Sequence, residues 1–171
     1  MKMVQLTFLG CLILLQTSIF SQTTYTFVLS NGDWSNANAW SPVGIPGPGD
    51  FVNIFNQNVH ITGQFTIAGF SLTDGTILFE GTNPTLTITD SAHWYDGEFD
   101  GGNGLGGGNL VNSKFIINPG AKLIIDTDST PNTHRFYEGI TVINQGTIRH
   151  IGSTNTGVRG FSVLRNEGLY D

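Results

Sequence analysis

The chain has 171 residues, 12% charged residues and a formal net charge of −6 at pH 7, a length suited to one domain. Nucleic-acid binding needs Lys and Arg side chains to displace phosphate counterions, and residues 22–113 contain neither. The composition therefore argues against a nucleic-acid partner, and its 12 Phe argue against a disordered chain.

The first 21 residues have the pattern of a secretory signal peptide. A short basic start, residues 1–3, precedes a mostly apolar run over residues 6–20, and the small Ser21 is suited to cleavage. The run is interrupted and shorter than the roughly 20 apolar residues of a transmembrane helix. We expect residues 1–21 to be removed, leaving a secreted, extracellular or cell-surface chain without a membrane span. Because the single cysteine, Cys11, lies in this segment, the mature chain would have no disulfide.

Residues 22–50 differ in composition from the rest of the chain. They carry two tryptophans, Trp34 and Trp40, and are rich in proline. A solenoid needs an atypical terminal segment to close its first core layer. We interpret residues 22–50 as an N-terminal cap or entry segment.

Residues 51–171 show the alternation of β-strands. Runs at 51–54, 65–67, 85–88 and 122–125 alternate apolar and polar residues between glycines and asparagines, which is typical of strands. No segment after the signal has a convincing helical period. The fold class predicted is all-β.

Three Asn-x-Gly sequences begin at Asn118, Asn144 and Asn166, 26 and then 22 residues apart, each between two apolar runs. A strand–turn–strand unit of this size predicts a stacked solenoid, and stacked asparagine amides can hydrogen-bond to one another. We predict a right-handed parallel β-helix over residues 51–171, continuing beyond Asp171. The alternative is a β-sandwich.

Residues 31–148 resemble the N-terminal region of large secreted, repeat-rich parallel β-helix proteins of bacteria. The resemblance is carried by the opening residues 34–54, by the segment 93–101, which is similar to a Trp-x-Gly-Gly-x-x-x-Gly motif with Asp96 in place of the first glycine, and by Asn-Gln-Gly-Thr-Ile at 144–148. It implies adhesins, surface-layer proteins and cargo of type IX secretion. The same group includes polysaccharide lyases and hydrolases.

The candidate metal ligands are Asp96, Glu98 and Asp100, which alternate so that a strand would place them on one face. Three carboxylates on one face could bind Ca²⁺, but Ca²⁺ takes six to eight oxygen ligands. We favour a solvated outer face, with no cofactor.

Other groups of polar residues suggest less chemistry. A glycine-rich stretch, residues 101–109, lacks the aspartate of a calcium-binding repeat, and the His60, His93 and His150 side chains have no ligand spacing. The mixed cluster of Asp126, Asp128, His134 and Arg135 flanks a loop, where charge is ordinary; we therefore expect no catalytic residues.

Four aromatic residues, Trp40, Trp94, Tyr95 and Tyr137, could stack on sugar rings, although core or cap packing is the favoured interpretation for the tryptophans. We expect a non-catalytic structural or adhesive segment whose partners are extracellular polysaccharides or cell-surface ligands. The alternative is a polysaccharide-binding or polysaccharide-degrading protein of the lyase or hydrolase type on the same fold.

Overall fold

The computed structural model describes residues 21–101, 112–126, 135–136, 139–152, 157–158 and 163–171. With 61% strand and 3% helix, the chain is all-β, which confirms the predicted class. Within this described part, no helix is both long and apolar enough to cross a membrane.

The described strands form two sheets and are accompanied by one 3₁₀ turn, η1 (Ala37–Ala39). The first sheet contains β1 (Thr24–Phe27), β2 (Asn31–Asp33), β3 (Trp40–Ser41), β4 (Phe51–Ile54), β5 (Gln57–Ile61), β7 (Gly69–Phe79), β9 (Ser91–Asp100), β11 (Lys122–Asp126), β12 (Arg135–Phe136), β14 (Thr147–Ile151), β15 (Gly157–Val158) and β17 (Leu169–Tyr170). The second sheet contains β6 (Gln64–Ile67), β8 (Thr85–Ile88), β10 (Ser113–Ile117), β13 (Ile140–Asn144) and β16 (Val163–Asn166).

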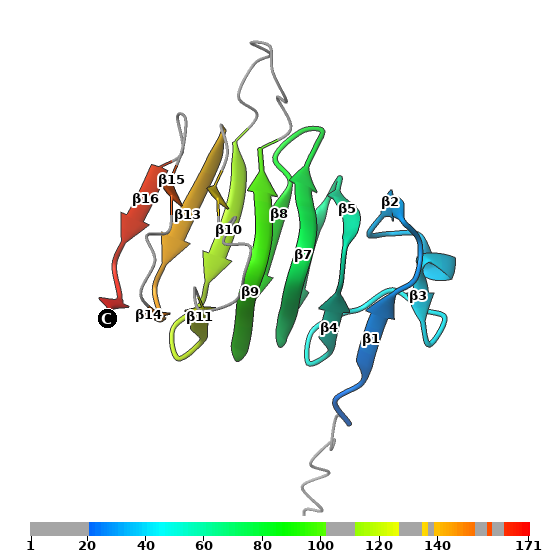
Figure 1. Cartoon of the computed structure of the whole chain (residues 1–171), viewed down its shortest axis with the longest axis horizontal. Coiled ribbons are helices and arrows are strands. Elements are labelled where there is room, and N and C mark those ends of the chain that lie inside the picture. The colour runs from blue at the N-terminus through cyan, green and yellow to red at the C-terminus, as the bar shows by residue number, and fades with distance from the viewer. Residues whose placement is uncertain (1–20, 102–111, 127–134, 137–138, 153–156, 159–162) are drawn as a thin grey trace, which may run out of the picture.

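Except for β1 and β3, neighbouring strands within each sheet are parallel, and their paired residues lie 18 to 37 positions apart in the sequence. Gln64 pairs with Thr85, and Thr141 pairs with Val163, so paired residues are 21 and 22 positions apart. Figure 1 shows the chain advancing along the long axis of the molecule from β1 to β16. Antiparallel pairing, which a β-sandwich requires, occurs among the described strands only between β1 and β3.

The interior is a stack of apolar side chains in register. Alternate residues of β8, β10 and β13 are buried, because successive side chains point to opposite faces. In the second sheet, the paired inner residues are Phe65, Leu86, Phe115 and Val142. Full burial of such a side chain contributes about 1.5–3 kcal/mol, so this stack stabilises the pairing of each strand with the next.

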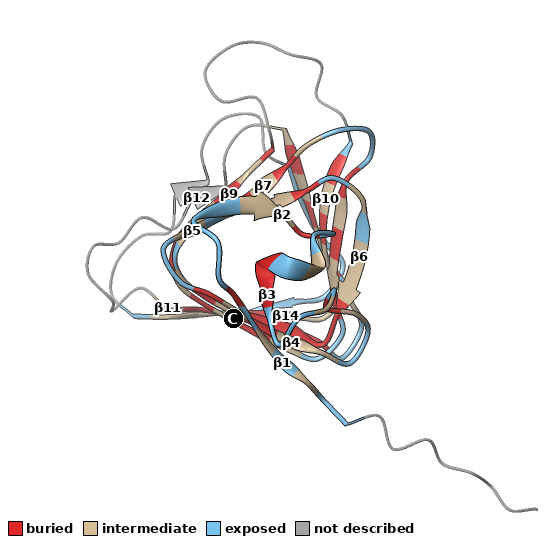
Figure 2. Cartoon of the chain, turned by 90° about the vertical axis from the view of Figure 1, so that its right-hand side faces the viewer, coloured by how far each residue is buried: buried red, intermediate tan, exposed pale blue. Residues whose placement is uncertain are grey.

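Two tryptophans cover the N-terminal end of this stack. Trp34 and Trp40 are buried, with ring centroids 4.8 Å apart, and Trp34 also lies 5.6 Å from Phe65, the first residue of the inner stack in the second sheet. The view along the chain in Figure 2 shows η1 and β3 over the middle of the ring of strands. The interpretation of residues 22–50 as a cap or entry segment stays a prediction.

The Asn-x-Gly sequences are not three equivalent corners. Asn144 pairs in register with Asn166, and its Nδ2 donates to Oδ1 of Asn166 at 2.6 Å, but the partner of Asn144 on the other side is Ile117. The predicted equivalence of Asn118 is therefore wrong. Four residues, 118–121, form the corner between β10 and β11, whereas two residues separate β13 from β14.

Two glycines with positive φ lie inside strands. Gly75 in β7 and Gly97 in β9 have φ values of +98° and +100°, which a glycine adopts without strain. The register between β7 and β9 shifts at the same place. These glycines bend two long strands that continue on either side of them.

Candidate functional site: a polar network on β2, β5 and β7

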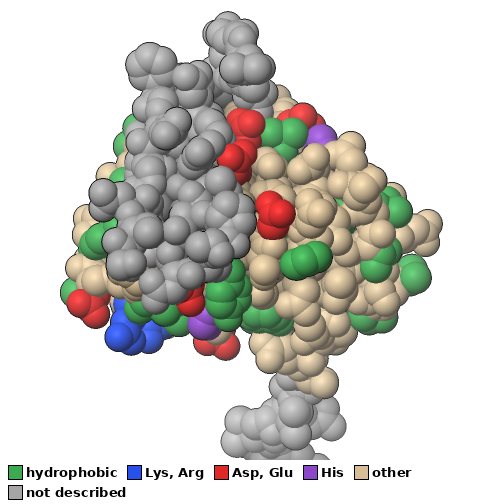
Figure 3. All heavy atoms as spheres, in the orientation of Figure 1, with side chains coloured by type: hydrophobic (Ala, Val, Ile, Leu, Met, Phe, Trp, Pro, Cys, Tyr) green, Lys and Arg blue, Asp and Glu red, His purple; other side chains and the backbone are tan. Residues whose placement is uncertain are grey.

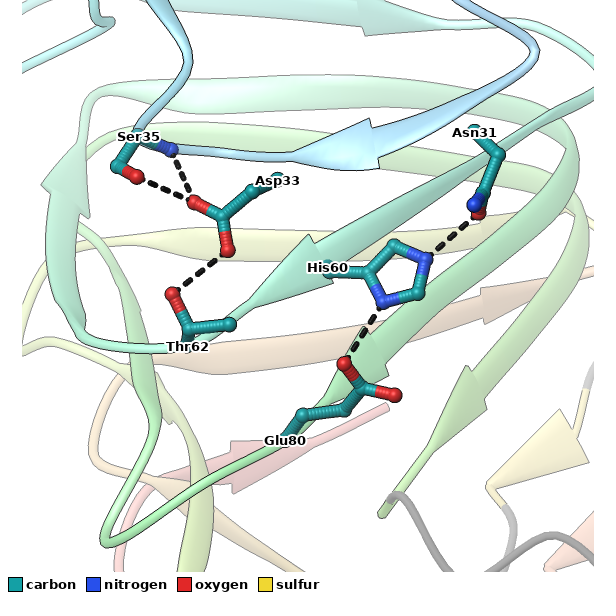
Figure 4. A network of polar contacts seen from close by, with 6 residues as sticks. All are labelled: Asn31, Asp33, Ser35, His60, Thr62 and Glu80. Atoms are coloured by element: carbon teal, nitrogen blue, oxygen red, sulfur yellow. Dashed lines mark hydrogen bonds and ion pairs between the residues drawn. The ribbon is translucent and has the colours of Figure 1, made fainter.

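A polar network joins residues of β2, β5 and the end of β7 in the first sheet and is drawn in Figure 4. Asp33 of β2 pairs with His60 of β5, which in turn pairs with Leu78 of β7. The side chains of the network are those of Asn31, Asp33, Ser35, His60, Thr62 and Glu80. We refer to them as the β2–β5–β7 network.

Both ring nitrogens of His60 are already in contact with oxygen atoms. Nδ1 lies 2.8 Å from Oε2 of Glu80, and Nε2 lies 2.6 Å from Oδ1 of Asn31. A general acid or base needs a nitrogen within hydrogen-bond reach of the substrate, and here neither is open. In this geometry His60 ties β5 to the segments on either side of it.

The carboxylate of Asp33 is similarly occupied. Oδ1 accepts hydrogen bonds from the backbone N and the Oγ of Ser35, and Oδ2 accepts one from Oγ1 of Thr62 at 2.7 Å. Partial burial by itself raises the pKa of Asp33, but the bonds from Ser35 and Thr62, with a smaller effect of His60, outweigh it and lower the pKa below its ordinary value of 3.8.

The lowered pKa predicts a pH-dependent contribution of Asp33 to stability. The ionised form stabilises the folded chain above pH 3.8, and this contribution is lost as the pH falls through the lower pKa of the folded state. Asp33→Asn should therefore lower the free energy of unfolding at neutral pH by at most about 1 kcal/mol, because the network is largely exposed. Urea denaturation of both proteins at about pH 7 and about pH 3 should show the difference shrinking in acid.

Two threonine variants control this experiment. Thr62→Val removes one of the bonds that lower the pKa of Asp33 and should weaken the pH dependence of stability. Thr66→Val changes a residue of β6, in the other sheet, and should leave the pH dependence of stability unchanged. An effect of Asp33→Asn that is equal at both pH values would contradict this role of the carboxylate.

The predicted calcium ligands do not share one face of β9. Asp96 is buried on the same face of β9 as Trp94. Glu98 and Asp100 follow the bend at Gly97 and lie on the outer, half-buried face of the strand. Oδ1 of Asp96 also accepts a hydrogen bond from the backbone N of Gly97 at 2.7 Å. Among the described residues, no group of three or more His, Cys, Asp or Glu side chains could hold a metal ion.

Asp96, Glu98 and Asp100 stay weak candidates for calcium binding, which titration can test. We expect the melting temperature of chelator-treated protein to be the same with and without added Ca²⁺, since three carboxylates divided between two faces offer few converging oxygens. A saturable rise in melting temperature that Glu98→Gln abolishes would instead establish the calcium site.

Three of the other polar residues singled out in the sequence lie on neighbouring strands of the first sheet. His93 lies in β9, Asp126 ends β11, and His150 lies in β14, where it pairs with Ile125. Most of the glycine-rich stretch, together with Asp128, His134, Tyr137 and the side chain of Arg135, lies outside the described residues.

The tryptophans are core residues, as favoured from the sequence. Trp40 donates from Nε1 to the carbonyl oxygen of Trp34 at 2.9 Å, and Trp94 donates from Nε1 to that of Gly97 at 3.1 Å. Because Trp40 and Trp94 are buried, neither offers a ring face to a sugar. Tyr95, in contrast, is half-buried on the outer face of β9.

The β2–β5–β7 network could not be found from sequence motifs, since its directly bonded partners are separated by as many as 29 residues. Its signal would have been the pairing distance of 27 residues between β2 and β5, which places Asp33 beside His60. On the face seen in Figure 3, the charged side chains of described residues are scattered and form no single large patch. Comparison of the chain with models of protein families, with curated proteins and with solved structures gave no match.

Proposed function

We propose that this chain is a segment of a secreted, right-handed parallel β-helix that serves as a non-catalytic scaffold or adhesive surface outside the cell. The observation that carries the proposal is the register of the sheets: parallel strands about 20–30 residues apart enclose one continuous apolar core. We use "coil" for one passage of the chain through both sheets.

This register supports a mechanical role. Each coil is hydrogen-bonded to the next along its strands, and neighbouring strands lie about 4.8 Å apart. The resulting body is stiff, and its outer side chains recur at that spacing. A repetitive surface can bind weakly at several places, so avidity rather than one pocket would supply affinity.

The β2–β5–β7 network fits the same role. Its hydrogen bonds run between strands of successive coils, from Asn31 through His60 to Glu80. The ring nitrogens of His60 and the oxygens of Asp33 are engaged in these contacts. The network therefore supports attachment of the N-terminal segment to the coils that follow, in preference to acid–base chemistry.

Export is the first part of the proposal to test. Expression of the whole chain in a bacterium should give a periplasmic or extracellular product whose first residue is Gln22, as mass spectrometry would show. Replacing Leu14 and Leu15 with arginine interrupts the apolar run and should retain the chain in the cytoplasm. An uncleaved wild-type chain in the cytoplasm would contradict the proposed location.

Binding without cleavage is the second part. The chain should bind extracellular polysaccharides or cell surfaces when it is displayed in many copies on beads, with a much lower apparent affinity as a monomer. Each bound polysaccharide is then incubated with the chain and its length is measured. Catalytic shortening of the polymer would overturn the non-catalytic proposal in favour of the lyase or hydrolase alternative.

One observation favours polysaccharide as the ligand class. The rings of His93 and Tyr95 on β9 stack with centroids 5.6 Å apart and an interplanar angle of 22°, and we infer that a sugar ring could pack against this aromatic pair. Tyr95→Ala should lower binding on a polysaccharide array by about tenfold, the equivalent of about 1.4 kcal/mol. Phe55→Ala, which removes an aromatic ring that is 63% exposed elsewhere, is the matched control. Equal binding by wild type and Tyr95→Ala would exclude this pair as the sugar contact.

A further inference from the structure

The two ends of the apolar core differ in how they are covered. At the N-terminal end Trp34 and Trp40 are buried under η1 and β3. At the other end, four large apolar side chains of β16 and β17 are between 45% and 58% exposed: Val163, Leu164, Leu169 and Tyr170.

Two of these exposed side chains occupy positions that belong to the core one coil earlier. Leu164 pairs with Val142, and Tyr170 pairs with Ile148, and both partners are 2% exposed. In-register parallel pairing places each side chain over its partner. Leu164 and Tyr170 therefore occupy inner positions. On the side away from β13 and β14, no strand among the described residues covers them.

The corner between β16 and β17 is hydrogen-bonded to the corner before it. Nδ2 of Asn144 donates to Oδ1 of Asn166 at 2.6 Å and to the carbonyl oxygen of Leu169 at 2.9 Å. Asn144 is buried, whereas Asn166 occupies the paired position and is exposed. Asn166 can therefore offer to a further coil the amide that Asn144 offers to it.

The glycines of these corners add a steric requirement. A Cβ on Gly168 would lie 2.1 Å from the carbonyl oxygen of Gly146, and one on Gly146 would lie 2.2 Å from that of Ala121. The obstructing atoms are backbone, which cannot rotate away. A coil stacked with the same geometry on Gly168 would therefore need glycine at the corresponding position.

We propose that the surface formed by β16, its Asn-Glu-Gly corner and β17 binds one further polypeptide coil of defined chemistry. That coil carries apolar residues over Leu164 and Tyr170, asparagine over Asn166 and glycine over Gly168. It adds to both sheets by parallel strand pairing, in the manner of β-augmentation. This inference rests on the coil architecture of the proposed function and adds the sequence that its open end selects.

The test adds such a coil to the full chain. In the first variant, a second copy of residues 150–171 follows Asp171, a length that matches the 22-residue distance between Asn144 and Asn166. In the control variant, the same extension has leucine and valine in place of its copies of Asn166 and Gly168. Backbone hydrogen exchange is then measured for residues 163–170.

The expected result is at least about tenfold slower exchange at residues 163–170 in the first variant and little change in the control. Asn166→Leu in the first variant should remove most of the gain. Equal exchange in both extended chains would overturn the proposal. So would dimerisation of the unextended chain that Leu164→Asp abolishes, because the surface would then bind a second copy.

Failure of the proposed binding surface can be distinguished from failure of the coil architecture. Exchange at β10 and β13, whose strands pair on both sides, reports on the existing coils. Slow exchange there with an ineffective extension rejects only the binding surface. Fast exchange throughout would reject the architecture on which both proposals rest.

Discussion

Gly69→Ala is expected to destabilise the chain by about 3 kcal/mol or more. A Cβ on Gly69 would lie 1.5 Å from the carbonyl oxygen of Ser91 and 2.6 Å from its carbonyl carbon. Since these are backbone atoms of the neighbouring strand, the methyl group fits only if β7 and β9 separate locally. Urea or thermal denaturation should show the loss, with the melting temperature falling by about 2–4 °C per kcal/mol for a chain of this size.

Gly63→Ala is the matched control for this prediction. A Cβ there meets only the ring of Phe65, at an ordinary contact distance of 3.6 Å. We expect the free energy of unfolding to change by no more than about 0.5 kcal/mol or to rise slightly, because alanine restricts the conformations of the unfolded chain. Similar losses in both variants would mean that the close approach of Gly69 to Ser91 is not what constrains this position.

Trp34→Ala is expected to cost about 3–5 kcal/mol, the usual range for removing a large buried aromatic side chain. The ring is fully buried and packs against both Trp40 and Phe65. Its loss would leave a cavity at the covered end of the core. Chemical denaturation measures the free energy of unfolding. Backbone hydrogen exchange should increase at β6 before it increases at β13.

Substituting phenylalanine for Trp34 and, separately, for Trp40 distinguishes the effect of packing from that of hydrogen bonding. The Nε1 of Trp34 is buried without a hydrogen-bond partner among the described residues, whereas that of Trp40 donates to the carbonyl oxygen of Trp34. Trp34→Phe removes a buried unpaired donor, and Trp40→Phe removes a paired one. Trp34→Phe should therefore be the milder change; the reverse order would contradict the assignment of these roles.

Much of the strand content was predictable because burial on one side imposes alternation. The predicted runs at 51–54, 85–88 and 122–125 correspond to β4, β8 and β11. Both faces of such a strand are specified by residue type, so the local sequence suffices. The burial of Trp34 and Trp40 was also predictable from the composition of residues 22–50 and from the position of that segment in the chain.

The errors came from features that depend on neighbouring coils. Asn118 looks like Asn144 in the sequence, but the longer corner after β10 places Ile117 in the paired position. Gly75 and Gly97 each lie within a strand, where the lack of a Cβ allows close approach to the adjacent backbone. Such requirements appear only when the pairing distance is known.

The β2–β5–β7 network was missed for the same reason. Asp33, His60 and Glu80 carry no recognisable spacing, and their contacts depend on which coil lies beside which. The predicted single face for Asp96, Glu98 and Asp100 failed because the bend at Gly97 reverses the alternation. Local periodicity predicts faces correctly until a backbone bend intervenes.

The register of the parallel strands is the central claim, and one distance tests it. Thr66 and Arg165 occupy corresponding outer positions of β6 and β16, linked through Thr87, Ile116 and Ile143. Their Cα atoms should be about 19 Å apart, four strand spacings of about 4.8 Å. Cysteine substitutions at both positions in a Cys11→Ser background would each accept a spin label.

Double electron–electron resonance between these labels should give one narrow distribution centred near that separation, allowing for the label arms. A shift of pairing or an antiparallel sandwich would place the two residues on unrelated strands. A broad distribution, or a single separation far longer than four strand spacings, would contradict the stacked parallel register and the scaffold proposed from it.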